Sequence, residues 1–415
     1  MYKTSNLLIA FGLLLLPLVL DAQVFKKLRI DPAQAHGGTV SEYFDEVEYI
    51  PLETTKESLF GEAIKFIVTD SGFVLFDPDT NALLFFGNDG KFFSKMKYPN
   101  GVRPEITSDL FARNIFVRHR EPTNVIEEVF DFTGKRISEK KIQDLSMLNP
   151  DMYNIRLNDS VYIVQNSCYY PMRRKPKDEI INSIEIHEGN KPPKVFMPVN
   201  QKEQAAYCGL SPGPIINISP PQNGMSYVTT TFTHFIYKLT QDEFKGLYQL
   251  VFPSNRTVPK NYIETKNEKL IDSLRQTDWL QQEDLIVRVR NVSIMGDFLF
   301  FKIDPGKYIW TESSVANAQY NFIYNLKTDR LVSLERISPN AKSFFLPVSN
   351  GPRTNVDGVV NFNGYNYLPI SALRMFSSFE KQKAGNPQYP PVLQEYFKTQ
   401  NRKSNPVIVK MKLKE

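Results

Sequence analysis

The chain has 415 residues, of which 41% are hydrophobic and 23% are charged. This apolar content is enough for a substantial core, so the composition excludes an intrinsically disordered chain. The formal net charge of +5 is spread out, and the densest basic cluster, residues 173–177, is followed directly by Asp178 and Glu179. Because a nucleic-acid-binding protein needs a broader basic surface, we expect no nucleic acid among the partners.

The first 22 residues have the composition of a secretory signal peptide. Lys3 precedes an apolar run, residues 7–20, which is shorter than the ~20 residues needed to span a membrane and is interrupted by Pro17. Cleavage after Ala22 gives a mature chain beginning at Gln23, and a membrane anchor is the alternative interpretation. No second long apolar stretch follows. We therefore expect an exported protein, periplasmic or associated with the cell surface, without an integral membrane segment in the mature chain.

Short alternating segments joined by polar turns recur along the rest of the chain. In LLFFGNDGKFF, residues 83–93, the turn GNDG lies between two apolar segments. Asp-Gly favours a tight hairpin because glycine adopts the positive φ that such turns need. Asp242 and Asp329 occupy two later turns, where we expect them to accept hydrogen bonds from their own backbone. The related segments are residues 129–137, 236–252 and 323–337.

The spacing of these hairpins predicts the fold. They recur about every 40 to 55 residues, which is the period of a β-propeller blade. Phe and Tyr, with 30 and 20 copies, favour strands over a helical solenoid of similar period. We predict an all-β, six-bladed β-propeller. The expected strands of the first unit are residues 64–70, 72–78, 81–87 and 91–97, and those of the second are a faint strand near 106–112, then 114–120, 126–132 and 135–142. The third unit has residues 159–166, 182–189 and 194–199. The fourth has 214–220, 224–232, 234–240 and 246–252, and the fifth has 289–296, 297–304, 322–328 and 330–337.

The sixth unit begins near residues 358–369 and takes its remaining strands from both ends of the chain. We expect residues 406–414 as its third strand and residues 46–53 as its outer strand, which pairs edges that are otherwise exposed. The expected organisation is a signal peptide over residues 1–22, a lead-in segment over 23–44 and a propeller domain over 45–415. Apolar residues at helical spacing indicate small helical insertions near 267–285 and 371–400.

The chain resembles the exported six-bladed β-propellers of Gram-negative gut-type bacteria, which are TolB-like in fold. The resemblance is carried by YIPLETT (49–55), LLFFGNDGKFF (83–93), IYKLTQDEFKGLYQLVF (236–252) and NPVIVKMKLK (405–414), and it spans the whole mature chain. These motifs are architectural. The resemblance therefore implies a fold and brings no catalytic residue with it.

Motifs that carry chemistry are not found in the sequence. The four histidines, His36, His119, His187 and His234, stand in separate segments, and no zinc-binding spacing occurs. DPDTN, residues 77–81, lacks the glycine and distal glutamate of a calcium loop, so we interpret it as a turn. No phosphate-binding or nucleophile-elbow motif is present. We assign no catalytic residue, no metal and no cofactor.

Two long loops between second and third strands carry the candidate ligand-binding residues. Loops on a rigid scaffold are common binding sites, and aromatic rings with arginine dominate many binding surfaces. The alternative is that these side chains pack their own loops against the blades. The candidates are Tyr169, Tyr170 and Arg173 in the first loop and Tyr308 and Trp310 in the second.

We expect a non-enzymatic binding or scaffold protein that holds a glycan, peptide or protein partner on this loop face. The alternative is a propeller hydrolase or lyase with its catalytic site in the central channel. Such a site needs several acidic or imidazole side chains on the innermost strands. The innermost strands that can be read hold one carboxylate, Asp70, at a strand end, which favours binding.

The only cysteines are Cys168 and Cys208. Export permits a disulfide between them, and closing that loop would contribute roughly 3 to 4 kcal/mol in the chain-entropy model. Two buried thiols that never meet are an equal alternative.

Overall fold

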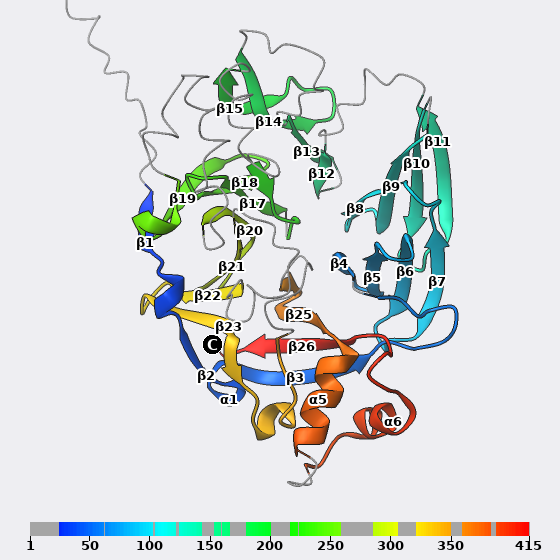
Figure 1. The fold of residues 1–415 in the computed structure, drawn as a ribbon. Coiled ribbons are helices and arrows are strands. Elements are labelled where there is room, and N and C mark those ends of the chain that lie inside the picture. Colours follow the sequence, from blue (N-terminus) through cyan, green and yellow to red (C-terminus); the bar gives the residue numbers. More distant parts are fainter. Residues whose placement is uncertain are drawn as a thin grey trace, which may run out of the picture.

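Six sheets stand around a central axis and form a six-bladed β-propeller (Figure 1). The predicted fold class, an all-β propeller with few helices, is therefore confirmed. The computed structural model describes residues 25–61, 63–102, 104–121, 124–142, 153–158, 160–166, 180–200, 216–222, 224–258, 285–305, 321–349, 359–382 and 387–414.

Blades 1 to 3 each consist of four antiparallel strands that follow one another along the chain. The expected hairpin turns are formed, since Gly90 and Gly134 have φ angles of 80° and 82°, where glycine alone is free of strain. From the innermost strand outward, blade 1 is β4 (Lys65–Val68), β5 (Gly72–Asp77), β6 (Ala82–Gly87) and β7 (Phe92–Lys97). Blade 2 is β8 (Glu105–Asp109), β9 (Asn114–Arg120), β10 (Val125–Asp131) and β11 (Arg136–Ile142), and blade 3 is β12 (Tyr153–Asn158), β13 (Val161–Gln165), β14 (Ile180–Glu188) and β15 (Lys194–Asn200).

Blades 4 to 6 each gain an outer strand from the N-terminal part of the chain. β1 (Lys26–Arg29) and β2 (His36–Thr39) add parallel fifth strands to the edges of blades 4 and 5, and β3 (Phe44–Pro51) completes blade 6. Blade 4 is β16 (Ile216–Ile218), β17 (Met225–Thr230), β18 (Phe235–Thr240) and β19 (Phe244–Val251), and blade 5 is β20 (Ile286–Met295), β21 (Phe298–Pro305), β22 (Asn321–Asn325) and β23 (Arg330–Ser338). Blade 6 contains β24 (Val360–Phe362), β25 (Tyr365–Ile370) and β26 (Val407–Leu413) before β3.

The ring closes through antiparallel pairing of β26 with β3, as the sequence predicts. Val409 lies opposite Tyr49 and Ile408 opposite Ile50, and both β26 residues are fully buried. The Tyr49 hydroxyl donates to the carbonyl of Leu346 at 3.0 Å, which satisfies its polar tip inside the core. The two ends of the propeller domain therefore share one sheet.

Blade-to-blade packing is hydrophobic at five of the six interfaces. One buried cluster lies at each of these five interfaces, for example where Phe85 of blade 1 contacts Phe130 of blade 2. Within the described ranges, no such cluster lies between blades 2 and 3. Their inner strands are joined instead by an ion pair, with Arg156 Nε 3.0 Å from Asp109 Oδ2.

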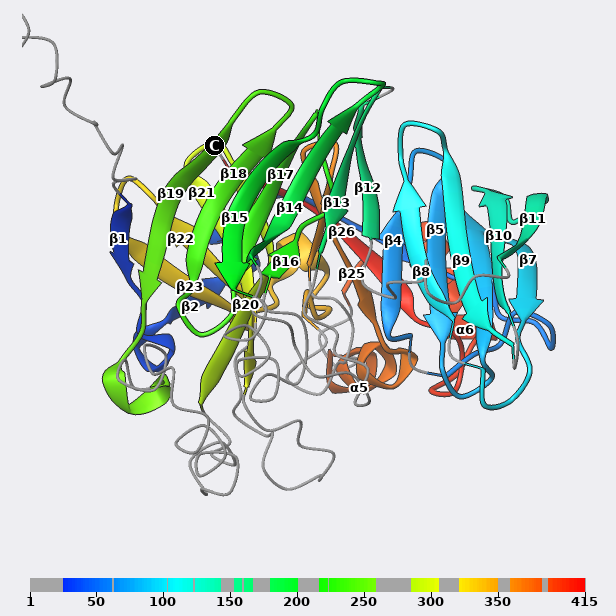
Figure 2. The same ribbon diagram turned by 90° about the horizontal axis from the view of Figure 1, so that it is seen from above.

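Two helices in the expected range, α5 (Ala372–Gln382) and α6 (Pro391–Thr399), connect β25 to β26. Met375 and Leu393 are fully buried against blades 5 and 6. In the side view, α5 lies at the rim opposite the β18–β19 hairpin (Figure 2). The helix expected near residues 267–285 lies outside the described residues. The remaining short helices are α1 (Val40–Tyr43), η1 (Pro32–Gln34), η2 (Ser254–Arg256) and η4 (Ala341–Ser343).

Two details differ from expectation. The inner strand of blade 3, β12, was not among the predicted strands, although its residues YNIRLN alternate between apolar and polar. In the turns at 240–243 and 325–329, side chains other than Asp242 and Asp329 accept from the backbone N–H groups, and Asp329 accepts instead from the Tyr324 hydroxyl at 2.9 Å. Thr240 Oγ1 accepts from the Glu243 N–H at 3.0 Å, and Asn325 Oδ1 accepts from the N–H two residues later at 2.9 Å. The first residue of each turn therefore makes the bond that we had assigned to the aspartates.

His234 is enclosed between β17 and β18. His234 is only 3% exposed, and the centroid of its ring lies 4.9 Å from that of the Phe252 ring. Burial lowers the pKa of His234 to about 4, and hydrogen bonds with the backbone of Val287 and Ile286 oppose this shift only partly. His234 is therefore neutral in the folded protein near pH 7.

Removing the closing strand should destabilise the whole domain. We expect deletion of residues 405–415 to abolish the cooperative thermal transition, because both blade 6 and the ring lose their closure. The milder Val409→Asn buries an amide in the core and should cost about 3 kcal/mol. Lys412→Asn, on the same strand but half-exposed, is the matched control and should cost under about 0.5 kcal/mol. An unchanged melting temperature after the deletion would contradict closure.

The buried His234 makes stability depend on pH. Because its folded pKa lies below the ordinary value of about 6.5, the unfolded chain binds the proton more readily, and stability falls as pH falls from 6.5 towards 4. Between pH 7.5 and pH 5 this residue should account for a loss of about 2 kcal/mol in urea denaturation. His234→Asn, chosen because asparagine tolerates the φ of 53°, should flatten the slope. The exposed His36→Asn is the control, and equal slopes in both variants would contradict the assignment.

Candidate central-channel site

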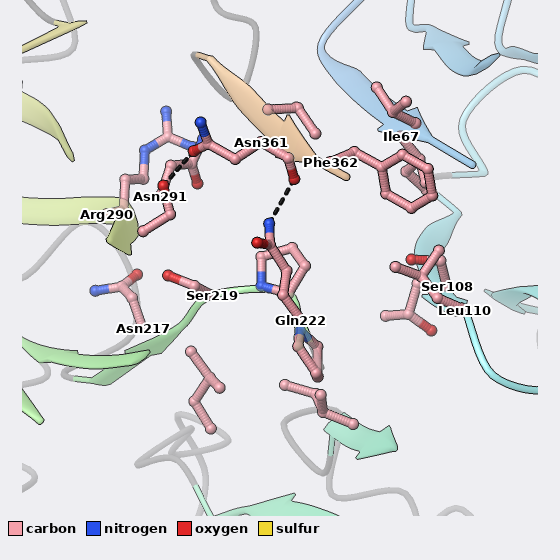
Figure 3. Close-up of a pocket in the computed structure, with 18 of the residues that line it drawn as sticks. Ile67, Ser108, Leu110, Asn217, Ser219, Gln222, Arg290, Asn291, Asn361 and Phe362 are labelled. Carbon is pink, nitrogen blue, oxygen red and sulfur yellow. Dashed lines mark hydrogen bonds between the residues drawn. The ribbon is translucent and has the colours of Figure 1, made fainter. Parts of the chain in front are cut away.

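The innermost strands of all six blades surround a cavity of about 390 Å³ on the propeller axis. This channel cavity is lined by β4, β8, β12, β16, β20 and β24 and by the segments that follow β8 and β16 (Figure 3). Its volume lies within the range of small-molecule sites.

The chain direction gives the channel two different ends. Each innermost strand begins at the rim where the chain arrives from the preceding blade, here called the link rim. Each ends at the rim that carries the tight turns between first and second and between third and fourth strands, here called the hairpin rim. Lys65 and Glu105, the first residues of β4 and β8, therefore mark the link-rim end of the lining, and Leu110 and Phe111 the hairpin-rim end.

The lining is dominated by neutral groups. Amides and hydroxyls can each donate and accept hydrogen bonds, so they suit a ligand that does the same. Among the aromatic rings, Phe111 is 39% exposed and Phe362 half-buried, whereas Phe66 is buried. The amide side chains are Gln165, Asn217, Gln222, Asn291 and Asn361, and the hydroxyl side chains are Thr107, Ser108, Ser219 and Ser293.

A short segment crosses the channel from blade 4 to blade 6. After β16, Pro220 and Pro221 lead to Gln222, whose Nε2 donates to the backbone carbonyl of Asn361 (Figure 3). Gln222 is also fixed in a tight turn, because its N–H and carbonyl both bond to Met225, at 2.8 and 3.0 Å. We call residues 220–222 the crossbar.

The far end of the crossbar rests on a buried polar network. The Oδ1 of Asn361 accepts from Ser293 Oγ of blade 5, and its Nδ2 donates to Oδ1 of Asn366 in its own blade. Asn361 is 7% exposed and Asn366 1% exposed. Linked amides of this kind fix one arrangement, because a buried polar group without its partner costs about 1 to 3 kcal/mol.

The two arginines of the lining are held by carboxylates behind them. Arg156 pairs with Asp109, and Arg290 Nε lies 2.7 Å from Asp304 Oδ2. Asp109 and Asp304 are 7% and 4% exposed. Among the described lining residues, Glu105 is the one carboxylate, and none is a histidine. Lys65, the fourth charged residue of the lining, lies with Glu105 at the link-rim end.

The histidines lie away from the channel. His119 has Nε2 3.5 Å from Glu128 Oε2 and belongs to the blade 1–2 interface, and His187 stacks on Tyr162 in blade 3. His234 is the buried residue discussed above. In the part of the chain that the structure describes, no group of three or more His, Cys, Asp or Glu side chains could hold a metal ion.

The residues singled out from the sequence lie outside the described ranges. These are Tyr169, Tyr170, Arg173, Tyr308, Trp310, Cys168 and Cys208. The strands on either side of the two loops are β13 with β14 and β21 with β22, so both loops do connect second to third strands. The roles of these residues and the disulfide remain predictions.

The sequence indicated that the inner strands carry few carboxylates, but it did not indicate their amides or the crossbar. Asp70 follows β4 at an exposed position, where it pairs with Arg113 and does not line the cavity. Asn217 and Asn291 lie within strands that the sequence had identified. Gln222 carries no local signal, because its partner Asn361 is 139 residues away.

The fold is similar to solved structures of other bacterial proteins. A Bacteroides fragilis protein described as exported shares 13% identity over 94% of this chain and 100% of its own, with a TM-score of 0.61. A DUF4221 family member from Bacteroides vulgatus shares 11% identity over 89% of this chain and 98% of its own, with a TM-score of 0.38. A Bacteroides caccae protein of unknown function also shares 11% identity, over 66% of this chain and 81% of its own, with a TM-score of 0.33. The first similarity supports the propeller fold alone.

None of the curated proteins matches the chain. No helix in the described ranges is long and apolar enough to cross a membrane. A family described as a domain of unknown function, DUF4934, matches residues 28–412. Since that match covers nearly the whole propeller, from the first outer strand to the last strand of blade 6, the chain belongs to the DUF4934 family.

Proposed function

We propose that this protein is an exported glycan-binding protein whose ligand enters the central channel. The observation that carries the proposal is the lining of the cavity, to which different blades contribute five amide and four hydroxyl residues. Gln165, Gln222 and Asn361 are already bonded within the protein, whereas the Nδ2 of Asn217 has no partner within the described residues. Sugars present closely spaced hydroxyls that both donate and accept, which is the pattern these side chains complement.

Apolar surface in the same cavity supports a sugar over a small ion. Sugar rings have apolar faces, and the rings of Phe111 and Phe362 offer partly exposed surfaces for them. Asn217 adds a second observation, because its enclosed Nδ2 has no hydrogen-bond partner within the described residues. A ligand hydroxyl or a bridging water would satisfy this group.

The competing function is a hydrolase or lyase acting in the channel. Glycoside hydrolysis generally uses two carboxyl groups on either side of the scissile bond. The described lining offers Glu105 alone, at the link-rim end, while Asp109 and Asp304 are engaged by arginines. This composition favours binding without turnover, and product analysis after incubation with bound oligosaccharide tests it directly.

Export is part of the proposal. The N-terminal signal-like segment motivates it, together with the structural similarity to a Bacteroides fragilis protein described as exported. The ligand is then a polysaccharide or oligosaccharide met in the periplasm or at the cell surface.

The channel assignment predicts which substitutions weaken binding. On an oligosaccharide array followed by calorimetry, Asn217→Ala and Phe111→Ala should each reduce affinity roughly tenfold or more, since each removes a direct contact. Melting temperatures should change little, because Phe111 is exposed and Asn217 lacks a protein partner in the described part of the chain. Asn88→Ala is the matched control, because its amide bonds the Asp70 carbonyl on an exposed turn away from the channel. Equal affinity in all three variants would reject the channel.

We further propose that Tyr169, Tyr170, Arg173, Tyr308 and Trp310 contact the same ligand from the two long loops. Trp310→Ala should then weaken binding roughly tenfold while the melting temperature barely moves, because an aromatic anchor at a binding surface contributes about 1 to 2 kcal/mol or more. If Trp310 packs only against its own loop, the substitution should instead lower the melting temperature and leave affinity per folded molecule unchanged.

A further inference from the structure

We infer that the channel recognises the end of a glycan chain and not an internal segment. This inference rests on the proposed function and adds its mode of recognition. Its basis is the crossbar, whose Gln222 side chain reaches across the channel near the hairpin rim, so that within the described residues the ligand would enter from the link rim.

The position of the crossbar follows from the chain direction. β16 runs from the link rim to the hairpin rim, so residues 220–222, which follow it, lie in the β16–β17 turn at the hairpin-rim end of blade 4. The Gln222 side chain then reaches the Asn361 carbonyl in blade 6, passing the inner strand of the intervening blade 5. In the close-up, Gln222 lies in the middle of the lining residues and points towards Asn361 (Figure 3).

The crossbar is stiff at both ends. Pro220 and Pro221 each fix φ near −65°, and Pro221 is buried. The paired backbone bonds between Gln222 and Met225 hold the other side of the residue. Its acceptor, Asn361, is held in turn by Ser293 and Asn366. A chain threading through the channel would have to break this set of bonds.

Cavity size agrees with a chain end. A volume of about 390 Å³ lies in the lower part of the ~300 to 1,000 Å³ range of small-molecule sites. It accommodates a short terminal piece of an oligosaccharide. The rest of the ligand would leave through the link rim, where the two long loops also begin.

The test uses linear hexasaccharides of maltose, cellulose and xylan type in three forms. One carries biotin at the reducing end, one at the non-reducing end, and one at both ends. Biosensor binding should survive in one singly tagged form and fall at least tenfold in the doubly tagged form. Equal binding of all three forms overturns chain-end recognition while leaving glycan binding intact. Absence of binding in every form, and to the array, rejects the proposed function and this inference with it.

Variants of the crossbar isolate its contribution. Gln222→Ala should bind the doubly tagged form to within about threefold of the preferred singly tagged form. Gln222→Asn keeps the amide but is too short to reach Asn361, so it should bind the doubly tagged form as Gln222→Ala does. Asn88→Ala, which loses one side-chain bond to a backbone carbonyl elsewhere, should keep the full discrimination. Circular dichroism verifies that each variant is folded, and unchanged discrimination in both folded Gln222 variants would overturn the role of the crossbar.

Discussion

Pairing between β3 and β26 is the interaction on which the rest of the molecule depends. Each blade buries its faces only against its neighbours, so an open ring would leave two faces and two strand edges in water. The β3–β26 ladder places the buried Val409 and Ile408 beside Tyr49 and Ile50, and thereby supplies the last blade with its outer strand. Only a closed ring brings six inner strands around one axis. The channel cavity is therefore a product of closure.

The interfaces between neighbouring blades differ in their chemistry, and the N-terminal strands add contacts on one side of the ring. β1 and β2 cover the outer edges of blades 4 and 5, where Leu28 and Ile30 enter the hydrophobic core. Blades 1 to 3 have no added strand in the described structure, and their edges carry protective features such as Lys95 in β7 and Pro198 in β15. The blade 2–3 joint, with its Asp109–Arg156 pair in place of an apolar cluster, is where local opening should require the least free energy.

Local signals made most of the fold predictable, and long-range contacts account for what was missed. Alternation and turn residues encode a hairpin within about ten residues, so blades, the β26 strand and the α5–α6 region could be predicted from the sequence. β12 carries the same local signal, the alternation of YNIRLN, and was nevertheless not predicted. For the site, the shortage of carboxylates on the inner strands could be predicted, but the crossbar could not. A bond between Gln222 and Asn361 depends on the closed ring and leaves no periodic trace in the sequence.

The polar channel is better explained by a ligand than by stability. Aliphatic side chains at these positions would remove the desolvation penalty of buried amides and would favour the folded state. Instead the axis carries linked amides, and the Nδ2 atom of Asn217, which lines the cavity, lacks a partner within the described residues. An orphaned, enclosed donor destabilises the free protein by about 1 to 3 kcal/mol, and a ligand or an ordered water that accepts from it recovers part of that loss. Under the proposed function, a chain end held between Asn217 and the crossbar would gain affinity, because the rigid blades have already fixed the positions of both.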